Sequence, residues 1–217
     1  MPWSEFFDTY SSRLLEATWE TIQLSVYSFA IGLVVGVIIV SFRVSPIPPL
    51  VKFATIFVSF FRNTPLLVLF FLAFFGLGEL GLVYSGFTTA VVALGLYTGA
   101  YLSEALRSGI NSVPQGQAEA GRAIGLGFVP LLTLIVIPQA VRTVIAPIGS
   151  LFIANAKNTA VALTISAPEL TALSRRMIND AAGTWRSLLT VAAIYTVLLL
   201  FVGWGFRGLE ERYAIKR

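Results

Sequence analysis

The chain has 217 residues, 56% of them hydrophobic and only 12% charged, and its mean hydropathy of +0.82 excludes a soluble domain and indicates a membrane protein. It contains no Cys and no His, which excludes disulfides, thiol chemistry and imidazole sites for metals or acid–base catalysis, so we expect no metal site and no catalytic residues. The net charge of +4 does not indicate nucleic-acid binding, because the charges cluster at the ends of apolar stretches.

Three stretches reach the roughly 20 apolar residues that a spanning helix needs without including a charge. They are residues 21–42, 80–103 and 187–206. Acidic residues precede the first stretch and Arg43 follows it directly, which argues against a cleaved secretory signal. The first stretch is therefore predicted to be a permanent membrane helix.

Two further regions are long enough to cross the membrane but are interrupted. Residues 53–78 contain Arg62-Asn63-Thr64-Pro65, and residues 128–156 contain Pro138, Arg142 and Pro147. Because proline removes a backbone donor and clashes with the preceding turn, each region should be kinked or split into two shorter helices. Broken helices are tolerated at membrane depth only against protein or a water-filled cavity.

The sequence thus predicts an all-α membrane protein with five transmembrane helices in one domain, residues 1–217. The expected spans are about residues 18–43, 52–78, 86–112, 129–157 (broken) and 186–207. With the N-terminus outside and the C-terminus cytoplasmic, nine basic residues lie on the cytoplasmic side and four outside, as the positive-inside bias requires. Residues 159–168 are apolar enough to dip back into the bilayer before an amphipathic outer helix that carries Arg175 and Arg176.

A short helix is predicted in the cytoplasmic loop of about residues 114–130. Ser112 with Gln115 fits a capping box, Pro114 suits the first turn, and Gly125 can end the helix. Its small residues would let another surface approach the backbone, while Glu119 and Arg122 could make polar contacts at the rim. The small residues are Ala118, Ala120, Gly121 and Ala123.

This loop resembles the coupling-loop signature of ATP-binding-cassette (ABC) importer permeases, Glu-Ala-Ala-x3-Gly-x9-Ile-x-Leu-Pro. The matching residues are Glu119-Ala120-Gly121, Gly125, Ile135 and Ile137-Pro138, with Gly121 in place of the second Ala and Ile137 in place of Leu. The resemblance implies a type I ABC importer transmembrane fold in the bacterial plasma (inner) membrane. It assigns contacts with the ATPase to Gln117, Glu119, Ala120, Gly121, Arg122 and Gly125.

Further segments are similar to the polar amino-acid branch of that family, which includes histidine, glutamine, arginine and glutamate permeases. These segments are Phe61-Arg62-Asn63-Thr64-Pro65-Leu66, residues 101–110 (YLSEALRSGI), Pro138-Gln139-Ala140-Val141-Arg142 and Lys157-Asn158-Thr159. Glutamate-type permeases look most similar. The resemblance implies two ABC ATPase subunits, a second permease that is identical or homologous, and an extracellular or periplasmic solute-binding protein.

Arg62 is the first candidate for substrate binding, because a charged side chain near the bilayer centre costs about 2.5–3.5 kcal/mol and is functional by default. An Arg fork and the helix start after Pro65 could together bind the α-carboxylate of an amino acid, with Asn63 and Thr64 beside them. The structural alternative is that Arg62 pairs with backbone carbonyls freed by Pro65, or snorkels between subunits.

Two further groups of candidates complete the predicted site. Lys157, Asn158 and Thr159 would approach the same depth, where Lys157 could read an acidic side chain or simply pin the helix end. Tyr97, Tyr101 and Glu104 share one helical face by their i, i+4 and i, i+3 spacing, so Glu104 could take the α-ammonium group. Glu104 also stands three residues before Arg107 and could instead pair with it.

The predicted function is inward translocation of a polar, glutamate-like amino acid by alternating access. No Walker pattern is present, so Mg-ATP is expected on the partner ATPase and the chain itself is expected to be neither an enzyme nor a cofactor carrier. Arginine, glutamine or histidine remain alternative substrates. An ion-coupled secondary transporter and a noncatalytic scaffold are rivals, whereas a membrane enzyme is disfavoured because no ionisable pair is expected at membrane depth.

Overall fold

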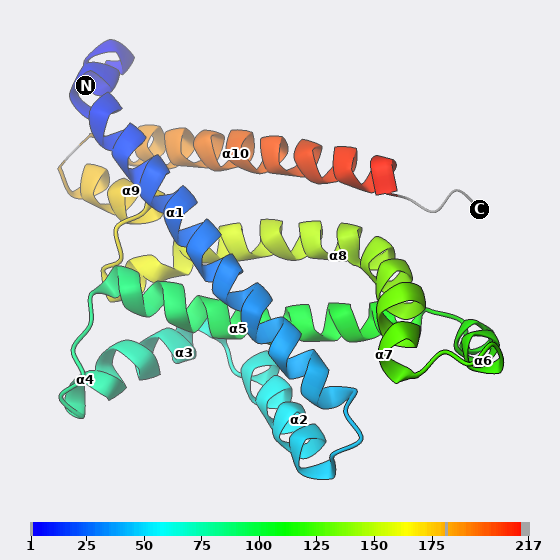
Figure 1. The fold of residues 1–217 in the computed structure, drawn as a ribbon. Coiled ribbons are helices and arrows are strands. Elements are labelled where there is room, and N and C mark those ends of the chain that lie inside the picture. Colours follow the sequence, from blue (N-terminus) through cyan, green and yellow to red (C-terminus); the bar gives the residue numbers. More distant parts are fainter. Residues whose placement is uncertain (1, 181, 214–217) are drawn as a thin grey trace.

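The computed structural model describes residues 2–180 and 182–213, and every regular element in that part of the chain is helical (Figure 1). In chain order the elements are α1 (Trp3–Arg43), α2 (Pro48–Asn63), α3 (Leu66–Phe71), the π-helical turn η1 (Leu72–Gly76), α4 (Leu77–Glu79), α5 (Gly86–Asn111), α6 (Gln115–Ala123), α7 (Phe128–Leu131), the π-helical turn η2 (Leu132–Val136), α8 (Ile137–Asn158), the 3₁₀ helix η3 (Thr159–Ile165), α9 (Leu170–Asn179) and α10 (Thr184–Tyr213).

Within residues 2–180 and 182–213, four helical stretches are long and apolar enough to cross a membrane. They are Trp3–Arg43, Gly86–Asn111, Phe128–Ile165 and Thr184–Arg212. A fifth crossing is present if Pro48–Asn63 and Leu66–Glu79 together form one broken span. The prediction of an all-α membrane protein is therefore confirmed.

The predicted break at Pro65 is present, since the helices on either side of it meet at 105°. The second interrupted region differs, because the helix continues from Phe128 to Ile165 through both prolines. Pro138 directly follows the π-helical turn η2, whose altered bonding pattern accommodates the missing N–H within the continuing helix. Figure 1 shows the chain turning between α7 and α8, so this region bends without breaking.

Small residues bring α1 and α5 into close contact at the centre of the molecule. A Cβ atom added to Gly99 would lie 2.7 Å from Cγ1 of Val35, and one added to Gly36 would lie 2.9 Å from Cβ of Leu102. Because lipid gives apolar helices no hydrophobic reason to associate, small residues that permit close backbone packing stabilise membrane helix pairs. This contact makes α1 and α5 the central pair of the fold.

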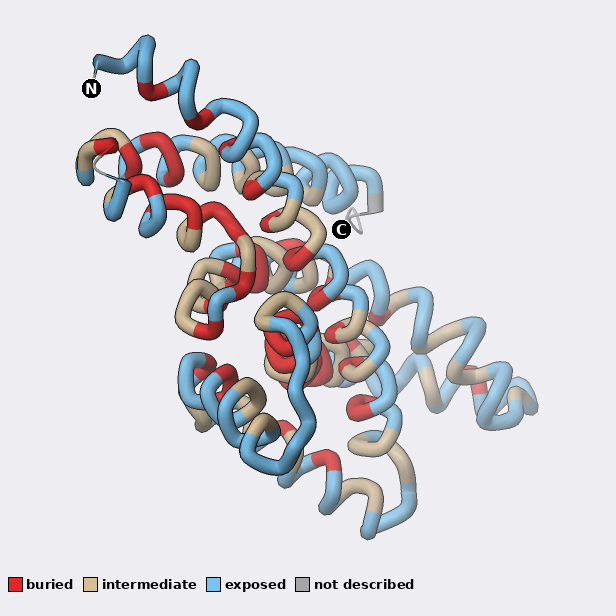
Figure 2. Tube along the Cα trace, turned by 90° about the vertical axis from the view of Figure 1, so that its left-hand side faces the viewer, coloured by how far each residue is buried: buried red, intermediate tan, exposed pale blue. Residues whose placement is uncertain are grey.

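A buried polar junction joins α8 to this pair, and we call its four residues, Ser25, Ser28, Thr98 and Asn155, the Asn155 junction. Asn155 is 1% exposed. Its carbonyl oxygen accepts from the hydroxyls of Thr98 (2.8 Å) and Ser28 (3.3 Å), and its amide donates to the Ser25 carbonyl (2.9 Å) and to Ser28 Oγ (3.0 Å). Figure 2 shows buried positions gathered where the helices meet, with outer faces exposed.

Candidate functional site

A cavity of about 300 Å³ opens where α1, α2 and α5 meet. Its lining residues are Arg43, Thr55, Val58, Ser59, Arg62, Asn63, Tyr101 and Glu104. We call this space the arginine cavity. It brings together Arg62, Asn63, Tyr101 and Glu104 from the predicted substrate site, although Arg62 and Glu104 lie on different helices.

Glu104 is surrounded by three arginines, and we call these four residues the Glu104 cluster. The carboxylate accepts hydrogen bonds from Arg43 and from Arg107, whose Nη2 lies 2.9 Å away, and Nη1 of Arg62 is 3.8 Å distant. The expected pairing of Glu104 with Arg107 is confirmed. Glu104 and Arg107 lie on the candidate span Gly86–Asn111, whereas Arg43 and Arg62 approach from α1 and α2. The expectation that no ionisable pair lies at membrane depth stays a prediction.

Arg43 was not expected in this site, because it stands at the C-terminal end of α1, 61 residues before Glu104. Arg62, expected to contact backbone carbonyls if it were structural, instead lies beside the Glu104 carboxylate. The cluster places three guanidinium groups against one carboxylate, a net charge of +2. Within the described part of the chain, Glu104 is the only acidic residue that lines the cavity.

Aromatic side chains support Arg62 from α5. Its guanidinium carbon lies 5.4 Å from the ring centre of Tyr101, within the range of a cation–π contact. The hydroxyls of Tyr101 and Tyr97 are 3.2 Å apart, which confirms that these two residues share one helical face. The Arg62 side chain nevertheless remains 45% exposed, so part of the guanidinium stays open to a ligand.

The polar residues that follow Arg62 are partly used by their own helix. The Asn63 amide donates to the Ser59 carbonyl and the Thr64 hydroxyl donates to the Phe60 carbonyl, each at 2.8 Å. These bonds satisfy the last turn of α2 before the break at Pro65. The Asn63 carbonyl oxygen and the second amide hydrogen keep their bonding capacity beside the cavity.

The Lys157-Asn158-Thr159 segment lies at the junction of α8 and η3 and does not line the arginine cavity. Lys157 is exposed, whereas Thr159 is fully buried, and its hydroxyl donates to the Ala156 carbonyl at 2.7 Å and lies 3.2 Å from the Tyr195 hydroxyl. A direct contact between Thr159 and a substrate would require this packing to open. The role of all three residues therefore stays a prediction.

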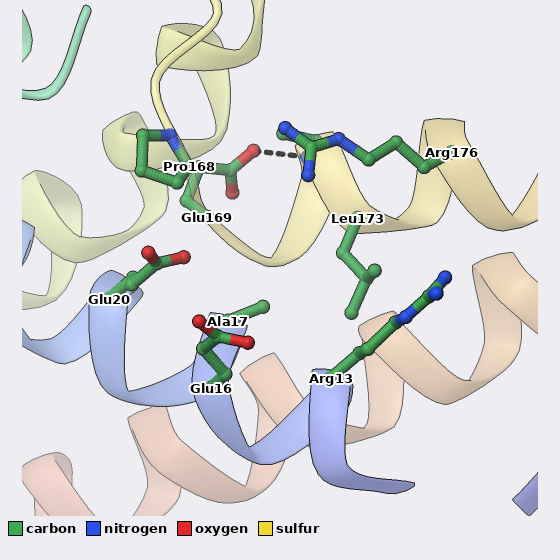
Figure 3. A pocket seen from close by; sticks show the side chains of 9 residues that line it. Arg13, Glu16, Ala17, Glu20, Pro168, Glu169, Leu173 and Arg176 are labelled. Carbon is green, nitrogen blue, oxygen red and sulfur yellow. Dashed lines mark hydrogen bonds between the residues drawn. The ribbon is translucent and has the colours of Figure 1, made fainter. Parts of the chain in front are cut away.

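A second cavity, of about 400 Å³, lies between α1 and the start of α9 (Figure 3). Glu16 and Glu20 enter it from α1, while Glu169 and Arg176 border it from the α9 side. Glu169 is 1% exposed, and its carboxylate caps α9 by accepting from the backbone N–H groups of the first turn. Burial raises the pKa of Glu169, opposed by these hydrogen bonds and by one from the Tyr195 hydroxyl.

Glu169 and Tyr195 were missed by sequence reasoning. Tyr195 Oη donates to Glu169 at 2.9 Å and lies 3.2 Å from Thr159 Oγ1, so one hydroxyl connects the second cavity with the Lys157-Asn158-Thr159 segment. The available sequence signal was the Pro-Glu pair directly before the amphipathic helix. That helix itself is confirmed as α9, which buries Leu170 and Met177 and exposes Arg175 and Arg176.

The expected loop helix is α6, but the residue at its N-terminus differs from the one predicted. Pro114 occupies the N-cap, while the Ser112 hydroxyl donates to the Gly109 carbonyl at the end of α5, so the proposed capping box was wrong. The C-terminal prediction is confirmed. Gly125 has φ +84°, and the N–H groups of Gly125 and Leu126 close onto the carbonyls of Arg122 and Gly121 in a Schellman motif.

The residues of α6 divide into two faces. Gly121 is buried, and an added Cβ would lie 2.5 Å from Cδ1 of Leu131, so this glycine packs against the chain itself and not against an outside surface. Gln117, Glu119, Ala120 and Arg122 are exposed. Large apolar residues beside them are also exposed, namely Ile124 (78%), Phe128 (75%) and Val129 (65%). This end of the molecule therefore presents an apolar patch around a polar helix.

Comparison with known proteins gives consistent matches. A family model described as the binding-protein-dependent transport system inner membrane component matches residues 28–214. The glutamate transport system permease protein GluC of Corynebacterium efficiens is 39% identical over 217 residues, covering 94% of this chain and 95% of that protein. The probable glutamine ABC transporter permease protein GlnM of Bacillus subtilis is 34% identical over 209 residues, covering 96% of each.

Solved structures agree in fold. A crystal structure of an amino acid ABC transporter with histidines matches with a TM-score of 0.90 and 29% identity, covering 95% of this chain and 96% of that one. The MetNI methionine ABC transporter, in an inward facing conformation, matches with a TM-score of 0.79 at 18% identity, covering 95% and 99%. The transmembrane fold of an ABC importer, expected from the resemblance, is confirmed.

Proposed function

The chain belongs to the binding-protein-dependent transport system inner membrane components, and from this premise we propose that it is the permease subunit of an ATP-driven importer for a polar, glutamate-like amino acid. Hydrolysis of ATP is assigned to two separate ATPase subunits, and this chain supplies part of the transmembrane path. A second permease, identical or homologous, and an extracellular binding protein complete the proposed assembly.

The observation that carries this proposal is the charge of the arginine cavity. Unmatched charge inside a membrane protein is costly and marks an ion or substrate pathway. With a net charge of +2 in the Glu104 cluster, the cavity favours an anionic group, and a guanidinium fork binds a carboxylate through two parallel hydrogen bonds. An amino acid brings such a group in its α-carboxylate, and glutamate brings a second one.

The proposed orientation follows from the basic residues at the helix ends. Arg43 ends α1, Lys52 lies in the first turns of α2, and Arg207 and Arg212 lie near the end of α10, all of which the positive-inside bias places in the cytoplasm. The N-terminus and α9 then face outside, while α6 faces the cytoplasm. In this orientation Glu104 lies seven residues from the cytoplasmic end of α5, about 10 Å along the helix axis.

Coupling to the ATPase is assigned to α6 and the apolar patch beside it. The Schellman motif at Gly125 fixes the end of α6, and Gly121 packs this helix against Leu131, so α6 can move with α7 as one body. Exposed apolar residues bordered by polar ones are typical of a protein interface. Closure of the ATPase pair would then displace α6 and open the path in alternation.

Other substrates of the same chemical class remain candidates, because the relatives include glutamine and arginine permeases. The cavity disfavours a cationic side chain, since Glu104 is its only acidic lining residue within the described chain and is already paired. Glutamine shares the α-carboxylate and is the second candidate. Competition of unlabelled amino acids against labelled glutamate would rank them.

The test is uptake of labelled glutamate into proteoliposomes that contain the assembled transporter with its binding protein. We expect uptake to require ATP and the ATPase subunits. Replacing Glu119 and Gly125 together by alanine and leucine should abolish uptake while the chain still inserts, whereas Glu5→Ala, an exposed acid on α1, should have no effect. Uptake driven by a sodium or proton gradient without the ATPase would contradict the proposal.

A further inference from the structure

We propose that Glu104 is a resident carboxylate that occupies the arginine cluster in the empty transporter and gives up Arg62 when a substrate carboxylate arrives. The inference rests on the proposed function and concerns the regulation of the same cavity. It assigns Glu104 a role opposite to the one predicted from the sequence, where it was expected to bind the α-ammonium group.

The three arginines do not hold Glu104 equally. Arg107 donates two hydrogen bonds to Oε2, at 2.9 and 3.2 Å, and Arg43 is bonded to Oε1. Arg62 approaches the same Oε1 at 3.8 Å, beyond hydrogen-bonding distance. It is also the most exposed member, with 45% of its side chain accessible against 18% for Arg43 and 38% for Arg107. Arg62 is therefore the partner that Glu104 can release most easily.

Releasing Arg62 leaves no charge without a partner. Glu104 retains its bonds to Arg43 and Arg107, and the Arg62 guanidinium keeps its position 5.4 Å from the Tyr101 ring centre. A buried charge is costly mainly when its partner is removed and nothing replaces it. Here the incoming carboxylate replaces Glu104 on Arg62, so the exchange conserves the number of ion pairs in the cavity.

The resident carboxylate also explains how so basic a cavity could avoid capture by any small anion. Without Glu104 the guanidinium groups of Arg43 and Arg62 would line the cavity with Arg107 behind them, a cluster charge of +3 that is strongly attractive to inorganic anions. With Glu104 in place, a ligand must compete for Arg62. An amino acid that makes further contacts with the lining can do so, whereas a simple anion has only its charge to offer.

The experiment measures glutamate affinity by calorimetry on the purified permease–ATPase complex, without binding protein. Glu104→Gln keeps the shape of the side chain but removes its charge. We expect the Kd for glutamate to fall about tenfold, as when a site occupied nine-tenths of the time by a competitor becomes free. Chloride or phosphate should also begin to compete with glutamate in this variant. The matched control is Glu5→Gln, which removes one exposed charge far along α1.

The direction in which the Kd for glutamate changes distinguishes the possible roles of Glu104. A Kd that rises in Glu104→Gln would show that Glu104 binds the substrate ammonium group, and an unchanged Kd would show a purely structural ion pair; either result overturns the inference. If Glu104→Gln fails to assemble, Glu104→Asp keeps the charge but shortens the reach toward Arg62, and its Kd should fall as well; a rise or no change there overturns the inference equally. Failure of the wild-type complex to bind any amino acid would instead count against the proposed function.

Discussion

The Asn155 junction and the Glu104 cluster each join α1 and α5 to a third helix, α8 at the junction and α2 at the cluster, yet their hydrogen bonding differs in kind. Asn155 is 1% exposed and both ends of its amide are bonded to groups of the chain. The Glu104 cluster opens to a cavity, and its single carboxylate is shared by three guanidinium groups. The Asn155 amide is fully hydrogen-bonded within the chain, whereas the Glu104 cluster carries a net charge of +2.

This difference indicates that the Asn155 junction stabilises the fold and that the Glu104 cluster binds a ligand. A satisfied buried network resists change, because each group removed from it leaves another without a partner. A cluster with excess charge in a membrane protein calls for a counter-ion from outside. Substitutions at the junction should therefore act on stability and affect every substrate alike, whereas substitutions at Arg62, the loosely held member of the cluster, should act mainly on binding.

The largest effect is expected from a bulky side chain placed between α1 and α5, beside the Asn155 junction. In Gly99→Leu the new side chain would collide with Val35, since even its Cβ lies 2.7 Å from Cγ1 of that residue. We expect loss of most of the folded protein, measured as monodisperse material after detergent extraction. Gly205→Leu is the control, because a Cβ there meets no atom within 4 Å. Normal yields of Gly99→Leu would show that the helices can separate freely.

A smaller effect on stability is expected from Asn155→Leu. It removes four hydrogen bonds, leaving the Thr98 hydroxyl without a partner and the Ser28 hydroxyl with only its 3.3 Å bond to the Ser25 carbonyl, which should lower the free energy of unfolding by about 2 kcal/mol. Thermal melting of the purified complex measures this change, with the exposed Asn179→Leu as reference. The prediction is contradicted if Asn155→Leu alters the Kd for glutamate more than it alters the melting temperature.

On the functional side, Tyr101→Leu should weaken glutamate binding. The variant removes the ring beside the Arg62 guanidinium, a contact that contributes about 0.5–1 kcal/mol, so the Kd should rise about two- to fivefold. Tyr101→Phe retains the ring and should bind nearly as the wild type does. Equal losses in both variants would instead assign the effect to the Tyr101 hydroxyl and its contact with Tyr97.

The smallest predicted effect concerns Lys157. If this exposed lysine reads an acidic side chain, Lys157→Gln should reduce the preference for glutamate over glutamine by up to about fivefold, the range of an exposed ion pair. Competition between the two amino acids in uptake measures that ratio. An equal change for both amino acids would remove Lys157 from side-chain recognition.

Features that depend on neighbouring residues in the chain were predictable from the sequence. Apolar runs predicted the spanning helices, Pro65 predicted the break between α2 and α3, and helical spacing paired Glu104 with Arg107 and Tyr97 with Tyr101. In each case the physical cause acts within one or two helical turns.

Contacts between distant segments were not predictable in the same way. Arg43 is 61 residues from Glu104, and Ser28 is 127 residues from Asn155. Periodicity shows which residues share a helical face but not which helix that face meets. The capping error at Ser112 has a similar origin, because its hydroxyl could bond either forward to α6 or back to α5, and the end of α5 takes it.

The central claim is that Arg62 receives the α-carboxylate of the substrate, and the most direct measurement pairs a variant with a modified ligand. Calorimetry on the purified complex would compare glutamate with 4-aminobutanoate, which lacks the α-carboxylate, in wild type and in Arg62→Ala. A lost charge-assisted pair of about 1.5–3 kcal/mol should raise the Kd for glutamate at least tenfold. The Kd for 4-aminobutanoate should be high in both proteins and nearly the same in each. Equal losses for the two ligands, or no loss for glutamate, would contradict the claim.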